Sequence, residues 1–119
     1  MQTKIELVNE QLPTVEMGKL VKFNGDLDAT NVEDVVEKVF ALMNDGDINI
    51  VADFSELRYV NSTGLGILLH FSKSAKEKDG SFKICNINEN VYEIIDIIGA
   101  TSLLEIYDAM DDAIASYNS

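Results

Sequence analysis

Residues 53–69 read DFSELRYVNSTGLGILL and contain the clearest structural signal in the sequence. The mostly apolar run that ends at Phe54 is typical of a strand inside a sheet. A polar turn follows, and the apolar spacing from Leu65 onward indicates a helix that begins near Ser62. The segment is therefore predicted to contain a strand, a turn and a helix, in that order.

Two hydroxyl side chains, Ser62 and Thr63, lie at the predicted start of this helix. Their ordinary explanation is helix capping, which contributes roughly 1 kcal/mol per cap. Gly64 and Gly66 need a further explanation, because glycine in a helix costs up to about 1 kcal/mol relative to alanine. Close packing against the sheet, or close approach of a partner, would offset that cost. A hydroxyl exposed at a helix N-terminus is also well placed to carry a phosphate, which free N–H groups and the helix dipole stabilise.

The sequence on both sides of this segment alternates between strand and helix signals. Period-two runs near the N-terminus, interrupted by Pro13 and ended by Gly25, predict an antiparallel hairpin. The further elements are expected as helices over 32–43, 62–78, 89–98 and 110–117 and as strands over 48–54, 81–86 and 103–107. Such alternation implies crossover helices and a mostly parallel sheet. We predict an α/β fold in a single domain, 1–119, with a mixed, mostly parallel sheet of about four to five strands and about four helices.

The predicted helix over 62–78 is apolar on more than one side. Its core stripe is expected to consist of Leu65, Leu68, Leu69, Ser72 and Ala75. Ile67 and Phe71 lie off that stripe, one and two turns along the helix. They could form the apolar part of a docking surface, or they could pack in the core between helices.

The charge of the chain excludes several classes of partner. With 119 residues, 21 of them acidic and nine basic, the formal net charge is −12. Binding to nucleic acid or to an anionic membrane relies on Lys and Arg, so neither is expected. No apolar stretch reaches the roughly 18–20 residues of a membrane span, and the start has no signal-peptide pattern. We therefore expect a cytoplasmic protein that inserts into no membrane.

Residues that would indicate an enzyme are few. There is no Gly-rich nucleotide-binding loop, and the chain has too few Cys and His residues for a zinc site. The one histidine, His70, lies in the middle of a predicted helix, and Cys85 lies in an apolar strand pattern that predicts a buried, unreactive thiol. We expect no catalytic residue, no cofactor and no metal.

The motif at 61–66, preceded by the turn at 53–55, resembles the signature of STAS domains. It is most similar to bacterial anti-sigma factor antagonists, whose pattern is hydrophobic-Asp-Ser-Ser/Thr-Gly-Leu-Gly. The early loop of that family, glycine followed by an acid, Ile or Leu, and Asp, is matched at 25–28. The segment 91–104 resembles the family's third helix and the turn that follows. The resemblance therefore runs nearly from end to end.

The resemblance implies a regulatory role based on phosphorylation. The family's phosphorylated serine matches Ser62, and Thr63 is the second candidate. The unphosphorylated form would bind an anti-sigma factor that is itself a serine kinase, phosphorylation would break the complex, and a metal-dependent phosphatase would restore it. The residues expected to bind the partner are Asp26, Asp28, Asn61, Ser62, Thr63, Gly64, Ile67 and Phe71. The protein itself would be a monomer or a weak dimer.

One position departs from the family pattern, because Asn61 stands where the family has Asp. This exchange favours a second hypothesis, a constitutive STAS scaffold or transporter subunit without phosphorylation. A third hypothesis, a nucleotide-binding domain, rests only on the N–H groups at the start of the Ser62 helix.

Overall fold

The computed structural model of the protein describes residues 2–118. Its elements are β1 (Ile5–Gln11), β2 (Gly18–Leu27), α1 (Val32–Asn44), β3 (Asn49–Asp53), β4 (Leu57–Val60), α2 (Ser62–Glu77), β5 (Ser81–Cys85), α3 (Glu89–Ile98), η1 (Thr101–Leu103), β6 (Glu105–Tyr107), α4 (Met110–Ala115) and η2 (Ser116–Asn118). The elements η1 and η2 are short 3-10 turns. The N-terminal hairpin, the four α-helices and the strands between them confirm the predicted order.

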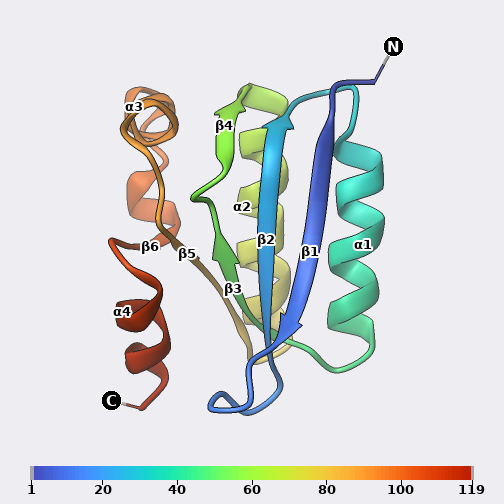
Figure 1. The fold of residues 1–119 in the computed structure, drawn as a ribbon, viewed down its shortest axis with the longest axis vertical. Coiled ribbons are helices and arrows are strands. Elements are labelled where there is room, and N and C mark those ends of the chain that lie inside the picture. Colours follow the sequence, from blue (N-terminus) through green and yellow to red (C-terminus); the bar gives the residue numbers. More distant parts are fainter. Residues whose placement is uncertain (1, 119) are drawn as a thin grey trace.

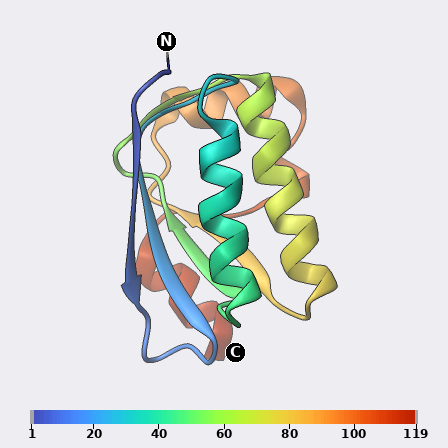
Figure 2. The same ribbon diagram turned by 90° about the vertical axis from the view of Figure 1, so that its right-hand side faces the viewer.

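The strands form one mixed sheet in the order β1-β2-β3-β5-β6, with β4 paired to β2. Within the described part of the chain, β1 and β2 are antiparallel and every other pair is parallel. Helices α1 and α2 lie together against one face, and α4 lies against the other (Figure 1). The same layers are visible from the side in Figure 2. This architecture confirms the α/β fold class with a mostly parallel sheet.

Strand β4 is not predicted by the sequence and raises the number of strands to six. Its four residues are buried, exposed, exposed and buried, so they lack the alternation that indicates a strand. The strand forms because β2 is long enough to pair with two neighbours, with β3 up to Lys22 and with β4 from Gly25 onward. A bulge between Gly25 and Asp26, where Gly25 has a φ of +129°, marks this change of partner.

Phe71 lies in the larger hydrophobic core, between the sheet and the helices α1 and α2. It is 0% exposed, and its ring centroid lies 5.5 Å from those of Phe40 and Phe82. Its assignment to the partner-binding surface is therefore wrong, and core packing is the correct interpretation. Ile67 and Leu69 are half-buried and pack against the edge of this core.

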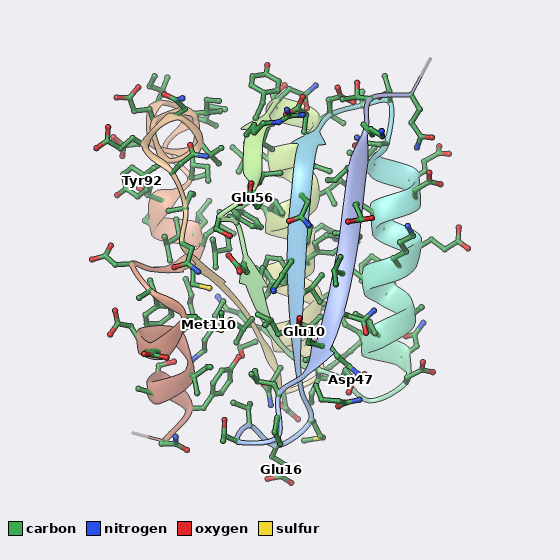
Figure 3. All side chains as sticks on the ribbon, viewed as in Figure 1. Glu10, Glu16, Asp47, Glu56, Tyr92 and Met110 are labelled. Carbon is green, nitrogen blue, oxygen red and sulfur yellow. The ribbon has the colours of Figure 1, made fainter. Side chains whose placement is uncertain are left out.

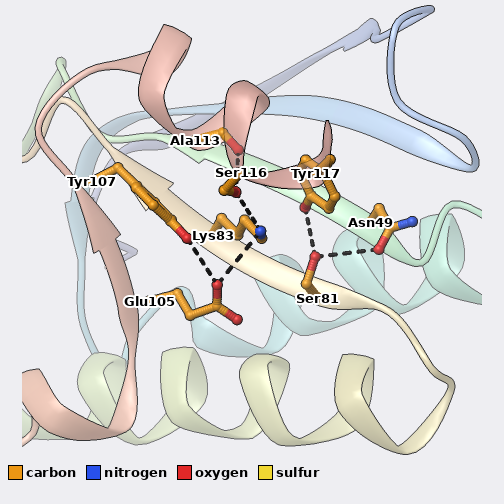
Figure 4. Close-up of polar contacts among 8 residues, drawn as sticks. All are labelled: Asn49, Ser81, Lys83, Glu105, Tyr107, Ala113, Ser116 and Tyr117. Atoms are coloured by element: carbon orange, nitrogen blue, oxygen red, sulfur yellow. Dashed lines mark hydrogen bonds and ion pairs between the residues drawn. The ribbon is translucent and has the colours of Figure 1, made fainter. Parts of the chain in front are cut away.

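Buried Lys83 on β5 contacts the C-terminal segment, which packs on the other face of the sheet (Figure 4). The ammonium group of Lys83 lies 3.6 Å from the Glu105 carboxylate and 4.0 Å from the ring centroid of Tyr117, and it donates a hydrogen bond to Ser116. The Tyr117 hydroxyl and the Ser81 hydroxyl are hydrogen-bonded at 2.6 Å. Because a buried charge needs partners, these contacts determine where the segment from α4 to η2 lies.

The acidic side chains are spread over the surface of the molecule. Figure 3 shows Glu10 on β1, Glu16 in the hairpin turn and Glu56 before β4, all on the outside of the fold. Dispersed carboxylates keep a domain soluble but do not define a site by themselves. None of the helices between residues 2 and 118 has the length and apolar character needed to cross a bilayer.

Burial gives Cys85 a measurable effect on stability at alkaline pH. It raises the pKa of the thiol from 9.0 to about 12, and the Asp53 carboxylate adds to the shift. The raised pKa means that the free energy of unfolding is unaffected below pH 9, where both states keep the proton. It falls between pH 9 and 12, because the unfolded chain loses the proton first, by up to about 1.4 kcal/mol per pH unit.

Urea unfolding of the wild type and of Cys85→Ala at pH about 8 and about 10.5 measures this effect. We expect the wild type to lose more stability than the variant over this interval. Burial also raises the pKa of Tyr117 to about 12, but Tyr117 is present in both proteins and its effect cancels. Equal losses in the two proteins would contradict the burial of the thiol.

Candidate protein-interaction site at the start of helix α2

Asn61 joins the end of β4 to the start of α2 and caps the helix. Its side-chain oxygen accepts a hydrogen bond from the Gly64 N–H at 2.8 Å, and its own backbone N–H donates to the Leu27 carbonyl at 3.2 Å. Ser62 and Thr63 are exposed, and neither side chain forms a hydrogen bond with another of the described residues. Capping therefore does not explain the two hydroxyls, which are available to another molecule.

The two glycines near the start of α2 have different surroundings. A Cβ atom on Gly64 would lie 2.7 Å from the Leu27 carbonyl oxygen and 2.8 Å from the Val60 side chain. A Cβ atom on Gly66 would meet no atom within 4 Å, and Gly66 is exposed. Close packing thus explains Gly64, which is buried and offers no surface to a partner. Gly66 leaves the α2 backbone open to close approach by another molecule.

The acidic loop, residues 25–28, comprises the last three residues of β2 and Asp28, and it lies next to the start of α2. Parallel pairing places Asp26 opposite Tyr59 and Leu27 opposite Val60. The chain therefore leaves β2 and β4 at the same end of the sheet, which places the backbone of Asp26 and Asp28 near the start of α2.

Hydrogen bonds from the buried side chain of Asn31 fix the conformation of the acidic loop. It is 1% exposed, and its side-chain amide donates hydrogen bonds to the Thr3 and Asp26 carbonyls at 2.9 and 2.8 Å. Its side-chain oxygen accepts from the Asp28 N–H at 3.1 Å. The sequence does not reveal this role, since an Asn before a helix is equally typical of a capping residue.

The two loop carboxylates have different partners. Asp26 lies 3.4 Å from the Arg58 guanidinium, whose side chain is 71% exposed. Hydrogen bonds from the side chains of Thr3 and Thr30 lower the pKa of Asp28 below its ordinary value. Arg58 is a site residue that sequence analysis missed, because nothing in its own segment indicates that β4 pairs with the acidic loop.

Together these residues form an exposed polar surface around a helix N-terminus. This surface comprises Asp26, Asp28, Asn61, Ser62 and Thr63. Gly64 is buried beneath it, and Ile67 lies one turn further along α2. Phe71 is buried in the core and is not part of the surface. Between residues 2 and 118, no group of three or more His, Cys, Asp or Glu side chains is arranged to hold a metal ion. The free N–H groups of the first helical turn favour an added negative charge on a hydroxyl here. The arrangement suits the binding of a protein surface, and it can carry a phosphate.

The family model described as the STAS domain matches residues 7–113. This match includes all of the sheet except the first two residues of β1, the hydroxyl pair, the acidic loop and the first four residues of α4. The chain therefore belongs to the STAS domain family.

Named relatives and solved structures agree with this membership. The anti-sigma F factor antagonist of Paenibacillus polymyxa is 29% identical over 91 residues, which cover 75% of this chain and 77% of that protein. The anti-sigma factor antagonist SpoIIAA in its unphosphorylated form matches with a TM-score of 0.75 at 19% identity, covering 97% of this chain and 96% of that chain. Its phosphorylated form, from Bacillus, matches with a TM-score of 0.68 at 18% identity, covering 93% and 98%.

The same fold also occurs within a transport protein. Murine Slc26a9, an anion transporter, matches with a TM-score of 0.76 at 20% identity. The match covers 87% of this chain but 18% of the transporter chain. At such identities the likeness shows the fold alone.

The different surroundings of the glycines predict opposite effects of the same substitution. Gly64→Ala should destabilise the protein by about 1–3 kcal/mol, because the new methyl group collides with the Leu27 backbone. Gly66→Ala should stabilise it by up to about 1 kcal/mol, because the site is open and alanine favours a helix. Urea unfolding of the two variants measures both effects. Similar stabilities for the two variants would contradict the close packing of α2 on β2.

Proposed function

We propose that this STAS domain is an antagonist of an anti-sigma factor. In its unphosphorylated form it binds an anti-sigma factor that is also a serine kinase, and this binding releases the sigma factor. The observation that carries the proposal is the exposed pair Ser62 and Thr63, which the Asn61 cap leaves unused by the fold. The relatives named as anti-sigma factor antagonists support it. No catalytic step is assigned to the domain, which acts by binding.

The docking surface is formed by the first two turns of α2 and the acidic loop. The Ser62 and Thr63 hydroxyls can donate and accept hydrogen bonds, and Gly66 permits close contact with the α2 backbone. Half-buried Ile67 adds apolar area next to them. Asp26 and Asp28 give this surface a negative side, which fits a partner with basic residues.

Phosphorylation of Ser62 would end binding through local charge. A phosphate adds about −1.5 to −2 charge at pH 7, next to the acidic loop. In the free protein, solvent and the helix N-terminus accommodate that charge. In the complex it would be desolvated and would repel any acidic group of the partner, so the equilibrium shifts toward the free form. No rearrangement of the fold is required.

The exposed position of Ser62 also makes the modification reversible. We propose that a metal-dependent serine phosphatase removes the phosphate and restores binding. The partners, kinase and phosphatase are cytoplasmic proteins in this scheme, and the domain acts as a monomer or weak dimer.

A second candidate is a constitutive STAS scaffold or transporter subunit. Two observations favour it, the Asn61 exchange and the fold shared with part of an anion transporter. Asn61 preserves the cap but removes a negative charge next to the phosphate acceptor. In this alternative the hydroxyl pair makes contacts without being phosphorylated. A partner pull-down that returns a transporter or an assembly of STAS proteins would favour it.

Phosphorylation and binding can be measured with the same partner. The protein is mixed with its cognate anti-sigma factor kinase and ATP, and the phosphorylated residue is identified by mass spectrometry. We expect one phosphate, on Ser62. Ser62→Ala should bind the kinase within about threefold of the wild type, and Ser62→Asp should bind at least about tenfold more weakly, a loss of about 1.4 kcal/mol.

Thr14→Asp is the matched control, because it adds the same charge in the exposed hairpin turn at the opposite end of β2. It should bind as the wild type does. Equal binding by Ser62→Ala and Ser62→Asp would contradict the charge mechanism. Intact binding without phosphate on Ser62 or Thr63 would rule out the kinase-substrate role.

A further inference from the structure

A groove lies between the second half of α2 and the turn η1, away from Ser62. Its volume is about 470 Å³, and it is lined by Leu69, Ser72, Lys73, Lys76, Glu77 and Leu103. Ser62 and Lys73 are 11 positions apart on α2, or about 17 Å at a rise of about 1.5 Å per residue. The groove is therefore separate from the hydroxyl pair.

Exposed apolar side chains continue from one wall of the groove. Leu103 is 59% exposed, and the last two residues of α3, Ile97 and Ile98, are 84% and 52% exposed. Gly99 and Ala100 connect that end of α3 directly to η1. Three large apolar side chains exposed within seven residues are more than scattered surface hydrophobicity, and they are typical of an interaction surface.

The charged side chains that line the groove are two bases, Lys73 and Lys76, and one acid, Glu77. The four bases on strands, Lys19, Lys22, Arg58 and Lys83, each have an acidic partner within 4.0 Å. Among residues 2–118 the five other bases have no such partner, and Lys73 and Lys76 are the two of these that line the groove. They lie three positions apart on one helix face and leave positive charge next to the apolar wall.

We propose that this groove binds an acidic amphipathic helix of a partner protein. Such a helix would place its apolar side chains against Leu69 and Leu103 and its carboxylates opposite Lys73 and Lys76. Grooves of this kind receive helices whose anchors recur every three or four residues. The groove is a second docking surface, and neither the proposed role of Ser62 nor its phosphorylation enters this assignment.

The test uses a synthetic acetylated helical peptide of about 16 residues, with leucine at helical spacing and glutamate on the flanking positions. Its control carries lysine in place of glutamate. Titrations are followed by amide chemical shifts of the labelled protein and by fluorescence anisotropy. We expect shifts at Leu69, Lys73, Lys76 and Leu103 with the acidic peptide and none with the basic peptide.

Protein variants distinguish an effect of the groove lysines from an effect of the net charge of the protein. Lys73→Glu/Lys76→Glu should weaken peptide binding at least about tenfold, and Leu103→Ser, at an exposed position, should weaken it about threefold or more. Lys38→Glu/Lys78→Glu makes the same charge change outside the groove and should keep the affinity within about twofold.

Several results would overturn the proposal. These are equal losses of peptide affinity in the two double variants, chemical-shift changes at residues outside the groove, and no binding of the acidic peptide. Concentration-dependent shifts of the same residues without peptide would instead assign the groove to a second copy of this chain. Binding to vesicles of anionic lipid that is lost in Lys73→Glu/Lys76→Glu would assign it to a membrane surface.

Discussion

The geometry of the site depends on contacts made by the backbone carbonyl of Leu27. It accepts a hydrogen bond from the Asn61 N–H, and it lies where a side chain on residue 64 would have to go. This contact holds the start of α2 against the end of β2, which leads into the acidic loop. Because Asn61 then caps the helix with its own side chain, Ser62 and Thr63 remain outside the internal bonding of the fold. The backbone thus presents two exposed hydroxyls beside two carboxylates.

Local patterns predict most of the fold because most of its elements have a regular period and clear end signals. Helix α3 is an example, since Asn88 caps it and Gly99 ends it in the left-handed conformation, as its sequence indicates. Strand β4 is missed because its four residues do not alternate and because it exists only through pairing with a distant part of β2. Phe71 is misplaced for a related reason. Its position on the helix wheel suggests a second face, but the rings of Phe40 and Phe82 make that face part of the core.

In the candidate site, too, the residues with a local sequence signal are predicted, and the residues whose roles depend on distant contacts are not. The hydroxyl pair and the acidic loop are visible as motifs, because their residue types and spacing carry the signal. Arg58 and Asn31 are not visible, because their roles depend on contacts with distant residues: Arg58 pairs with Asp26, 32 positions away, and Asn31 bonds to Thr3, 28 positions away. Both residues orient the acidic loop, so the loop has a defined conformation on the surface. The charge of the surface is therefore not uniform: two carboxylates lie beside the start of α2, whereas two bases and one acid line the α2 groove.

The central claim is that the protein docks through the start of α2 and the adjacent acidic loop without changing its fold. Hydrogen–deuterium exchange on the complex with the cognate anti-sigma factor tests it most directly. The N–H groups of Ser62 and Thr63 precede the first hydrogen bonds of α2, so we expect them to exchange quickly in the free protein. We predict slower exchange at residues 26–28 and 61–67 in the complex and unchanged exchange in β1 and β5. Unchanged exchange at the start of α2, with protection elsewhere on the domain, would contradict the account.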